Sequence, residues 1–178
     1  MSVELTGRYV KKELGEHGIN QSIYNISIPL EYLFYAFVFR IHYENKVYKQ
    51  ASAIFITIFP VFVLVNILFI QGFGGYNSNI VKIGTLSMVL LACFYFLDLL
   101  RMEGDVKLLQ IPMFWIATGV LLFNAGEFLF SIALDYLFDK FPKETFKVFG
   151  SIIFKLICVL YTCISISVLC SGKKLQKA

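Results

Sequence analysis

Residues 51–70 read ASAIFITIFPVFVLVNILFI, an apolar run without a single charged side chain. As an α-helix, a run of this length rises about 30 Å, which matches the hydrocarbon thickness of a lipid bilayer. A membrane-spanning β-strand needs only about ten residues and alternates apolar with polar positions, and this run is longer and continuous. The stretch therefore predicts a transmembrane helix.

The composition of the whole chain supports the same interpretation. Of its 178 residues, 58% are apolar and only 16% are charged, and the mean hydropathy is +0.72. A water-soluble domain needs a polar exterior, and about a quarter of its residues are usually charged. We therefore expect the lipid bilayer to be the main partner of this chain.

Four further apolar segments accompany the central run. The five predicted spans are residues 22–39, 51–70, 80–100, 111–137 and 149–170. Because the connections between them are short, neighbouring helices must run antiparallel. We expect an all-α fold, a helical transmembrane bundle of about five spans with short loops, that forms one domain over residues 22–170.

The predicted bundle lies between a polar N-terminal tail, residues 1–21, and a basic C-terminal tail, residues 171–178. The first twenty residues contain no continuous apolar segment and no small-residue cleavage site, so we expect no cleavable signal peptide. Basic residues are divided almost evenly between the two sides of a five-span bundle. The uncharged connection QGFGGYNSN (71–79) and the basic C-terminal tail favour an N-terminus outside and a C-terminus in the cytoplasm.

Polar residues recur at helical spacing within three of the spans, so that each set shares one face of its helix. The sets are Tyr24, Ser27, Glu31 and Tyr35 in the first span, Asn124, Glu127, Ser131 and Asp135 in the fourth, and Ser151, Lys155, Cys158, Thr162 and Ser165 in the fifth. Charged groups at membrane depth are costly and usually face the interior of a bundle. We expect all three faces to turn inward.

Counting residues along the spans places three charged groups at similar depth. With a rise of 1.5 Å per residue, Glu127, Glu31 and Lys155 lie roughly 15, 13 and 9 Å from the same membrane surface. We expect Lys155 to pair with Glu127, with Glu31, Asn66 and Asn124 in the same intramembrane polar cluster. This cluster is either a device that holds the helices in register or a binding or transport site.

The sequence contains no pattern that is typical of an enzyme or a metal site. His17 and His42 lack the spacing of metal ligands, the four cysteines form no CxxC pair, and no GxSxG motif is present. We therefore expect no catalytic residue, no metal, no cofactor and no nucleic-acid partner.

Three segments carry a resemblance to known proteins. They are IYNISIPLEYLFYAFVFR (23–40), IFITIFPVFVLVNILFIQGFGGYNS (54–78) and IPMFWIATGVLLFNAGEFLF (111–130). Over most of residues 20–170 the pattern resembles uncharacterised bacterial multi-pass membrane proteins, typically of six or seven spans, whose arrangement is similar to the membrane sensor portions of some signalling kinases. The resemblance implies a topology and a bacterial inner-membrane location, but no catalytic or binding residue.

Two functions remain open at this point. The first is a non-enzymatic sensory or accessory module whose helices bind a small ligand, another membrane protein or a second copy of the chain. The alternative is a small solute or proton-coupled transporter subunit that uses Glu31, Glu127 and Lys155.

Overall fold

The computed structural model describes residues 17–73, 77–101, 107–140 and 142–175, and within them all side chains except those at 17–21, 134–147, 149 and 173–175. The long helices are α2 (His17–His42), α3 (Lys46–Val65), α4 (Ser78–Leu99), α5 (Pro112–Lys140) and α6 (Pro142–Leu175). Two short segments join them, a π-helical segment η1 (Asn66–Ile70) and a 3-10 turn η2 (Leu108–Gln110). The described part contains no strand, so the predicted all-α fold is confirmed.

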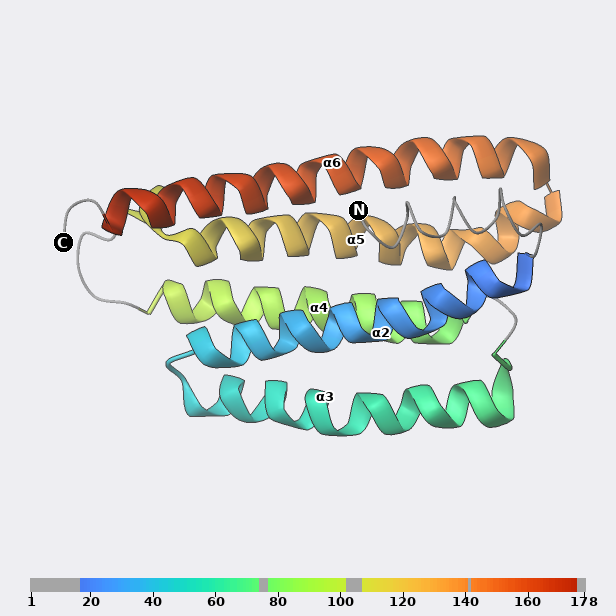
Figure 1. Cartoon of the computed structure of the whole chain (residues 1–178), viewed down its shortest axis with the longest axis horizontal. Helices are drawn as coiled ribbons and strands as arrows, with labels where there is room; N and C mark the ends of the chain where they lie inside the picture. Colours follow the sequence, from blue (N-terminus) through green and yellow to red (C-terminus); the bar gives the residue numbers. More distant parts are fainter. Residues whose placement is uncertain (1–16, 74–76, 102–106, 141, 176–178) are drawn as a thin grey trace.

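Successive helices run antiparallel, as the short connections predict (Figure 1). Helix α4 is the centre of the arrangement, because it packs against α2, α3 and α5. Helix α6 packs mainly on α5 and forms one outer wall of the bundle. One end of the bundle gathers the C-terminal ends of α2, α4 and α6 with the N-terminal ends of α3 and α5 (Figure 1).

Four helical segments of the described chain have the length and apolarity of membrane spans. They are Lys46–Ile70, Ser78–Leu99, Pro112–Ala133 and Gly150–Gly172, and they correspond to four of the five predicted spans. The fifth prediction, residues 22–39, lies within α2, which forms a helix but is not among these four. Its polar residues, which include Asn25 and Glu31, lower its apolarity below that of the other helices.

The predicted boundaries differ most around α6. This helix begins at Pro142, well before the predicted start at residue 149, so the polar segment that was expected to be a loop is largely helical. Most of the predicted N-terminal tail and the side chain of Asp135 lie outside what the structure describes.

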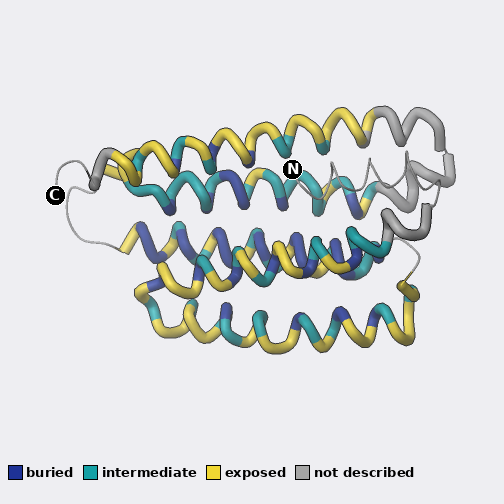
Figure 2. The backbone as a smooth tube through the Cα atoms, in the orientation of Figure 1, coloured by how far each residue is buried: buried dark blue, intermediate teal, exposed yellow. Residues whose placement is uncertain are grey.

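Aromatic and aliphatic side chains from α2, α3, α4 and α5 form a continuous core. At its centre the ring of Tyr32 lies over Gly84 and meets the ring of Phe59 edge to face, with 5.9 Å between ring centroids. Helix α2 approaches α4 closely here because Gly84 has no side chain. Figure 2 shows the complementary pattern, in which the outward faces of the helices are mostly exposed.

Many of these outward-facing side chains are large and apolar. They include Leu30, Phe34, Phe37 and Ile41 on α2, Ile58, Val61, Leu64 and Leu68 on α3, and Phe154, Val168 and Leu169 on α6. Water-soluble proteins rarely expose such large contiguous apolar surfaces. The exposed faces therefore suit contact with lipid, in agreement with four helical segments that are long and apolar enough to span a membrane.

Candidate functional site

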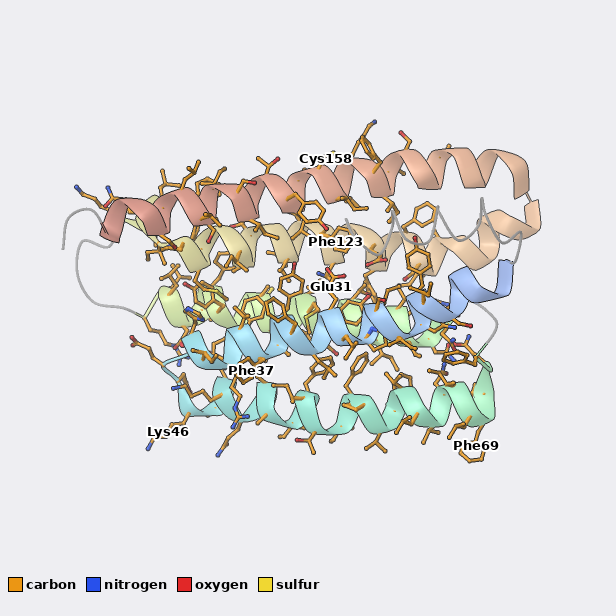
Figure 3. The ribbon with its side chains drawn as sticks, in the orientation of Figure 1. Glu31, Phe37, Lys46, Phe69, Phe123 and Cys158 are labelled. Carbon is orange, nitrogen blue, oxygen red and sulfur yellow. The ribbon has the colours of Figure 1, made fainter. Side chains whose placement is uncertain are left out.

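The acidic residues of the first and fourth predicted spans lie close together. Glu31 on α2 points toward α5 (Figure 3), and its charge acts on that of Glu127 on α5. One helical turn further along α2, Tyr35 interacts electrostatically with both Glu31 and Tyr161 of α6. On this face of α2, Glu31 is exposed and Tyr35 is half-buried, and both lie within electrostatic reach of α5 or α6.

The amide of Asn124 lies one helical turn before Glu127 on the same face of α5. Its side chain is only 2% exposed, and its Nδ2 donates a 2.8 Å hydrogen bond to the backbone oxygen of Val120. Its Oδ1 is buried and has no hydrogen-bond partner. A buried carbonyl oxygen without a donor is costly, so Oδ1 is an open acceptor one helical turn from Glu127.

We use the name central acidic site for Glu31, Asn124 and Glu127. Its polar atoms that are open to a ligand are mainly oxygens, because the one amide nitrogen already donates one hydrogen bond to the backbone. Oxygen atoms of this kind bind protons or hard cations. Within the described residues there is no group of three or more His, Cys, Asp or Glu side chains that could hold a metal ion.

Lys155 does not join this site. Its side chain is exposed on α6, and although both residues are described, the structure records no ion pair between it and Glu127. The whole polar face of the fifth predicted span shares this outward position. The exposed residues of this face are Ser151, Lys155, Cys158, Thr162 and Ser165. The expected inward face is therefore wrong for α6.

The reason lies in how α6 packs against α5. Gly119 lies against Cys163 and Leu160, and Gly126 lies against Leu156, so two glycines of α5 receive the apolar face of α6. Small residues of this kind let two membrane helices approach closely. Burying that face leaves the face opposite to it, which carries Lys155, on the outside of the bundle.

Asn66 belongs to a separate network at the end of α3. It is fully buried in η1, and its Nδ2 donates to Asn77 at 2.8 Å and to Gln71 at 3.0 Å. Its Oδ1 accepts a 3.2 Å bond from Asn79. These contacts join the end of α3 to the start of α4, so Asn66 holds the connection between the two helices.

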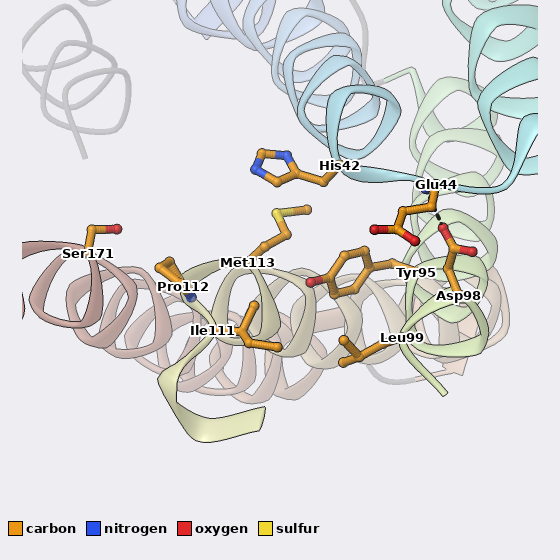
Figure 4. A pocket seen from close by; sticks show the side chains of 9 residues that line it. All are labelled: His42, Glu44, Tyr95, Asp98, Leu99, Ile111, Pro112, Met113 and Ser171. Carbon is orange, nitrogen blue, oxygen red and sulfur yellow. Dashed lines mark hydrogen bonds between the residues drawn. The ribbon is translucent and has the colours of Figure 1, made fainter. Parts of the chain in front are cut away.

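A cavity that the sequence did not predict lies at the opposite end of the bundle. Its volume is about 350 Å³, and its lining comes from the ends of α2, α4, α5 and α6 (Figure 4). Its lining residues are His42, Glu44, Tyr95, Asp98, Leu99, Ile111, Pro112, Met113 and Ser171. These residues lie far apart in the sequence, and no spacing pattern connects them. The one sequence feature that could have pointed to this cavity is the concentration of charged residues at the ends of three spans.

Asp98 fixes the wall of this end cavity. Its carboxylate accepts hydrogen bonds from the backbone nitrogens of Glu44 at 2.6 Å and of Asn45 at 3.2 Å. In the same turn, which connects α2 to α3, the hydroxyl of Tyr43 donates a 2.6 Å hydrogen bond to the backbone oxygen of Leu91. Burial, and secondly the negative charge of Asp98, raises the pKa of Tyr43 above its ordinary value.

The fold is a helical bundle, and four of the described helical segments are long and apolar enough to cross a membrane. No protein-family model, curated protein or solved structure matches the chain. Its more specific function must therefore be argued from its own residues.

Proposed function

We propose that the protein is a non-enzymatic sensory or accessory module of a membrane, and that it binds a proton or a small cation at the central acidic site. The observation that carries this proposal is the proximity of Glu31 and Glu127, on two different helices, beside the unpaired Oδ1 of Asn124. No ion pair is recorded for either carboxylate among the described side chains. Two acids placed in this way repel each other unless something positive lies between them.

A purely structural role explains this arrangement poorly. Two neighbouring carboxylates in an apolar bundle destabilise it, and a buried oxygen without a donor adds a further cost. Such costs are typical of residues that are kept for binding. A proton or cation held between the three side chains would remove both costs and would draw α2 toward α5.

Binding at this site would couple to helix position. Helix α2 packs against α3 and α4, whereas α5 packs against α4 and α6, so the two carboxylates belong to different parts of the bundle. A ligand that bridges them changes the relative stability of two arrangements of these parts. This is the property that a sensory module requires.

The test is the thermal unfolding midpoint of the purified protein in detergent, measured from pH 8 to pH 5 and in NaCl or KCl. A bound proton or cation stabilises the folded state by mass action, by about 2.7 kcal/mol at one hundred times its dissociation constant. We expect the midpoint to rise toward pH 5 or to differ between the two salts. Tyr35 and Tyr161 lie beside the site, but tyrosine ionises only near pH 10.

Two variants make this test specific. In the Glu31→Gln, Glu127→Gln double variant the dependence on pH and on the cation should disappear while the folded protein remains abundant. Lys49→Gln, which removes an exposed charge outside the site, should retain it. The proposal would be contradicted if the wild-type unfolding midpoint changed neither with pH nor with the cation. It would also be contradicted if the double variant kept the wild-type dependence on either.

The location follows from the same proposal. We place the protein in the bacterial inner membrane, with the N-terminus outside and the C-terminus in the cytoplasm, as the resemblance and the basic residues suggest. Arg40, Lys46 and Lys49 lie at the end of the bundle where α6 also ends, which supports a cytoplasmic position for that end. Labelling of single cysteines introduced at residues 49 and 73 with a membrane-impermeant maleimide tests this, since only residue 73 should react in intact cells once the native cysteines are replaced.

A transporter subunit is the alternative function. Helix α3 ends in the π-helical segment η1, and interrupted helices are frequent in transporters. Proteoliposomes with a trapped pH indicator separate the two functions. A transporter subunit predicts a proton flux driven by a solute gradient that Glu127→Gln abolishes, whereas the module predicts no flux.

We also propose that the outward polar face of α6 contacts a partner, either another membrane protein or a second copy of the chain. A lysine that faces lipid is costly, and small polar residues beside it permit close helix packing. The hydroxyls of Thr162 and Ser165 already bond to backbone oxygens of their own helix, so Lys155 is the group that needs a partner. Lys155→Leu should change the mass of the detergent-extracted assembly, while Lys49→Leu should not.

A further inference from the structure

The end cavity has the features of a binding site that is independent of the central acidic site. Its volume of about 350 Å³ lies within the range of small-molecule pockets. Four helix ends and the turn between α2 and α3 contribute to its lining, so its shape depends on the assembled bundle. The chemistry of its lining therefore determines which ligand it can recognise.

The cavity contains an unpaired hydrogen-bonding group. Tyr95 is only 6% exposed, and Figure 4 shows its hydroxyl pointing into the cavity between Met113 and Ile111. The ring is held in place by the neighbouring rings of Phe39 and Phe96, with centroids at 6.2 and 6.0 Å. No hydrogen bond is recorded for this hydroxyl, although buried tyrosine hydroxyls usually have a partner.

The electrostatic character of the lining is acidic. Glu44 and Asp98 both line the cavity, and no arginine or lysine is among the described side chains that line it. Two backbone nitrogens bond to Oδ2 of Asp98 and hold that carboxylate in the wall, whereas the carboxylate of Glu44 lies beside the ring of Tyr95 (Figure 4) without a recorded hydrogen bond. The single histidine, His42, bonds through Nδ1 to the backbone oxygen of Val38. The described lining thus contains two carboxylates, of which that of Glu44 has no recorded hydrogen bond.

The remaining walls are apolar. Leu99, Ile111, Pro112 and Met113 supply apolar side chains to the lining. A ligand that satisfies this lining carries a positive charge at one end and a hydrocarbon group at the other. An anion would meet Glu44, and a bare metal ion would leave the apolar walls without contact.

We propose that the end cavity binds a small organic ammonium ion, whose charged nitrogen lies between the carboxylate of Glu44 and the hydroxyl of Tyr95. An ammonium group donates several hydrogen bonds, so it can satisfy both acceptors at once. The face of the Tyr95 ring adds a favourable surface for a cation. The hydrocarbon part of the ligand then packs on Met113 and Ile111.

The test uses three probes of the same size that differ in charge: benzylammonium, benzyl alcohol and benzoate. Binding to the purified full-length protein in detergent is measured by isothermal titration calorimetry, with detergent alone titrated to subtract partitioning. We expect saturable binding of benzylammonium, and binding at least tenfold weaker for the alcohol and for benzoate. Equal affinity for the ammonium ion and the alcohol would overturn the proposal.

Variants locate the binding within the cavity. Glu44→Gln should weaken benzylammonium at least tenfold and leave benzyl alcohol unchanged, because it removes only the charge. Tyr95→Phe should weaken the ammonium ion about threefold to tenfold. Lys49→Gln is the matched control, because it changes one charge at the same end of the bundle outside the lining. Wild-type affinity in Glu44→Gln would show that the ammonium ion does not bind here, and it would leave the central acidic site untouched.

Discussion

The contact between α2 and α4 makes a quantitative prediction for Gly84→Ala. A methyl group at this position would lie 2.9 Å from Cζ of Tyr32 and still closer to two other ring atoms. The ring is 4% exposed and confined by Phe59, so it cannot move aside freely. Overpacking of a core costs about 1–3 kcal/mol, and the severity of this overlap suggests about 3. Alanine regains about 1 kcal/mol of helix propensity, which leaves a net loss of about 2 kcal/mol.

For a chain of this length, that loss corresponds to a fall of about 4–8 °C in the unfolding midpoint. The assay is thermal unfolding of the detergent-extracted protein, followed by circular dichroism. Gly150→Ala is the matched control, because Gly150 is helical and exposed and has no atom within 4 Å of the added methyl group. It should be neutral or slightly more stable. If Gly84→Ala unfolds at the same temperature as Gly150→Ala, the close packing of α2 on α4 is refuted.

Two further predictions concern the turn between α2 and α3. Asp98→Ala removes the acceptor of two backbone nitrogens and should lower the free energy of unfolding by about 2–3 kcal/mol. Hydrogen bonds to a charged group contribute about 1.5–3 kcal/mol each, and water replaces part of them in the variant. An unchanged unfolding midpoint in the same thermal assay would show that other contacts hold the turn. Tyr43→Phe removes the 2.6 Å bond to Leu91 and should cost about 1 kcal/mol at neutral pH. Because the pKa of Tyr43 is raised in the folded protein, its contribution is complete below about pH 10 and is lost as the pH rises further, when only the unfolded chain ionises. The midpoint of Tyr43→Phe should therefore fall less between pH 9 and pH 11 than that of the wild type, and parallel curves would contradict this.

Much of the fold was predictable from the sequence because the length of an apolar segment is read directly from consecutive residues and predicts a helix. Residues 51–70 contain no charge, and a helix is the only structure by which such a single segment satisfies its backbone in lipid. The short connections then forced antiparallel neighbours. The boundaries of α6 were less predictable, since polar residues at a membrane surface can extend a helix as easily as end it.

The orientation of α6 was not predictable, and the reason is physical. Periodicity groups residues on a face, but it does not say which face meets the neighbouring helix. The polar face around Lys155 was expected to turn inward, yet the glycines at 119 and 126 favour close contact with the opposite, apolar face. Packing of small residues thus outweighed the preference for a buried charge.

Of the two candidate sites, one was predictable from the sequence and the other was not. The proximity of Glu31 and Glu127 follows from depth and helical spacing, which are local counts along two spans. The end cavity depends on where four helix ends meet, and that is a property of the assembled bundle. Tyr95 and Glu44 have no distinctive spacing, so only the structure reveals that both line one cavity.

The most direct test of the central acidic site is a pair of double-mutant cycles on the unfolding free energy. One cycle combines Glu31→Gln with Glu127→Gln, and the other combines Glu127→Gln with Lys155→Gln. We predict a coupling of about 0.5–3 kcal/mol in the first cycle, because the two carboxylates act on each other, and additivity within about 0.5 kcal/mol in the second. Coupling between Glu127 and Lys155, together with additivity of Glu31 and Glu127, would contradict the account and restore the ion pair in its place.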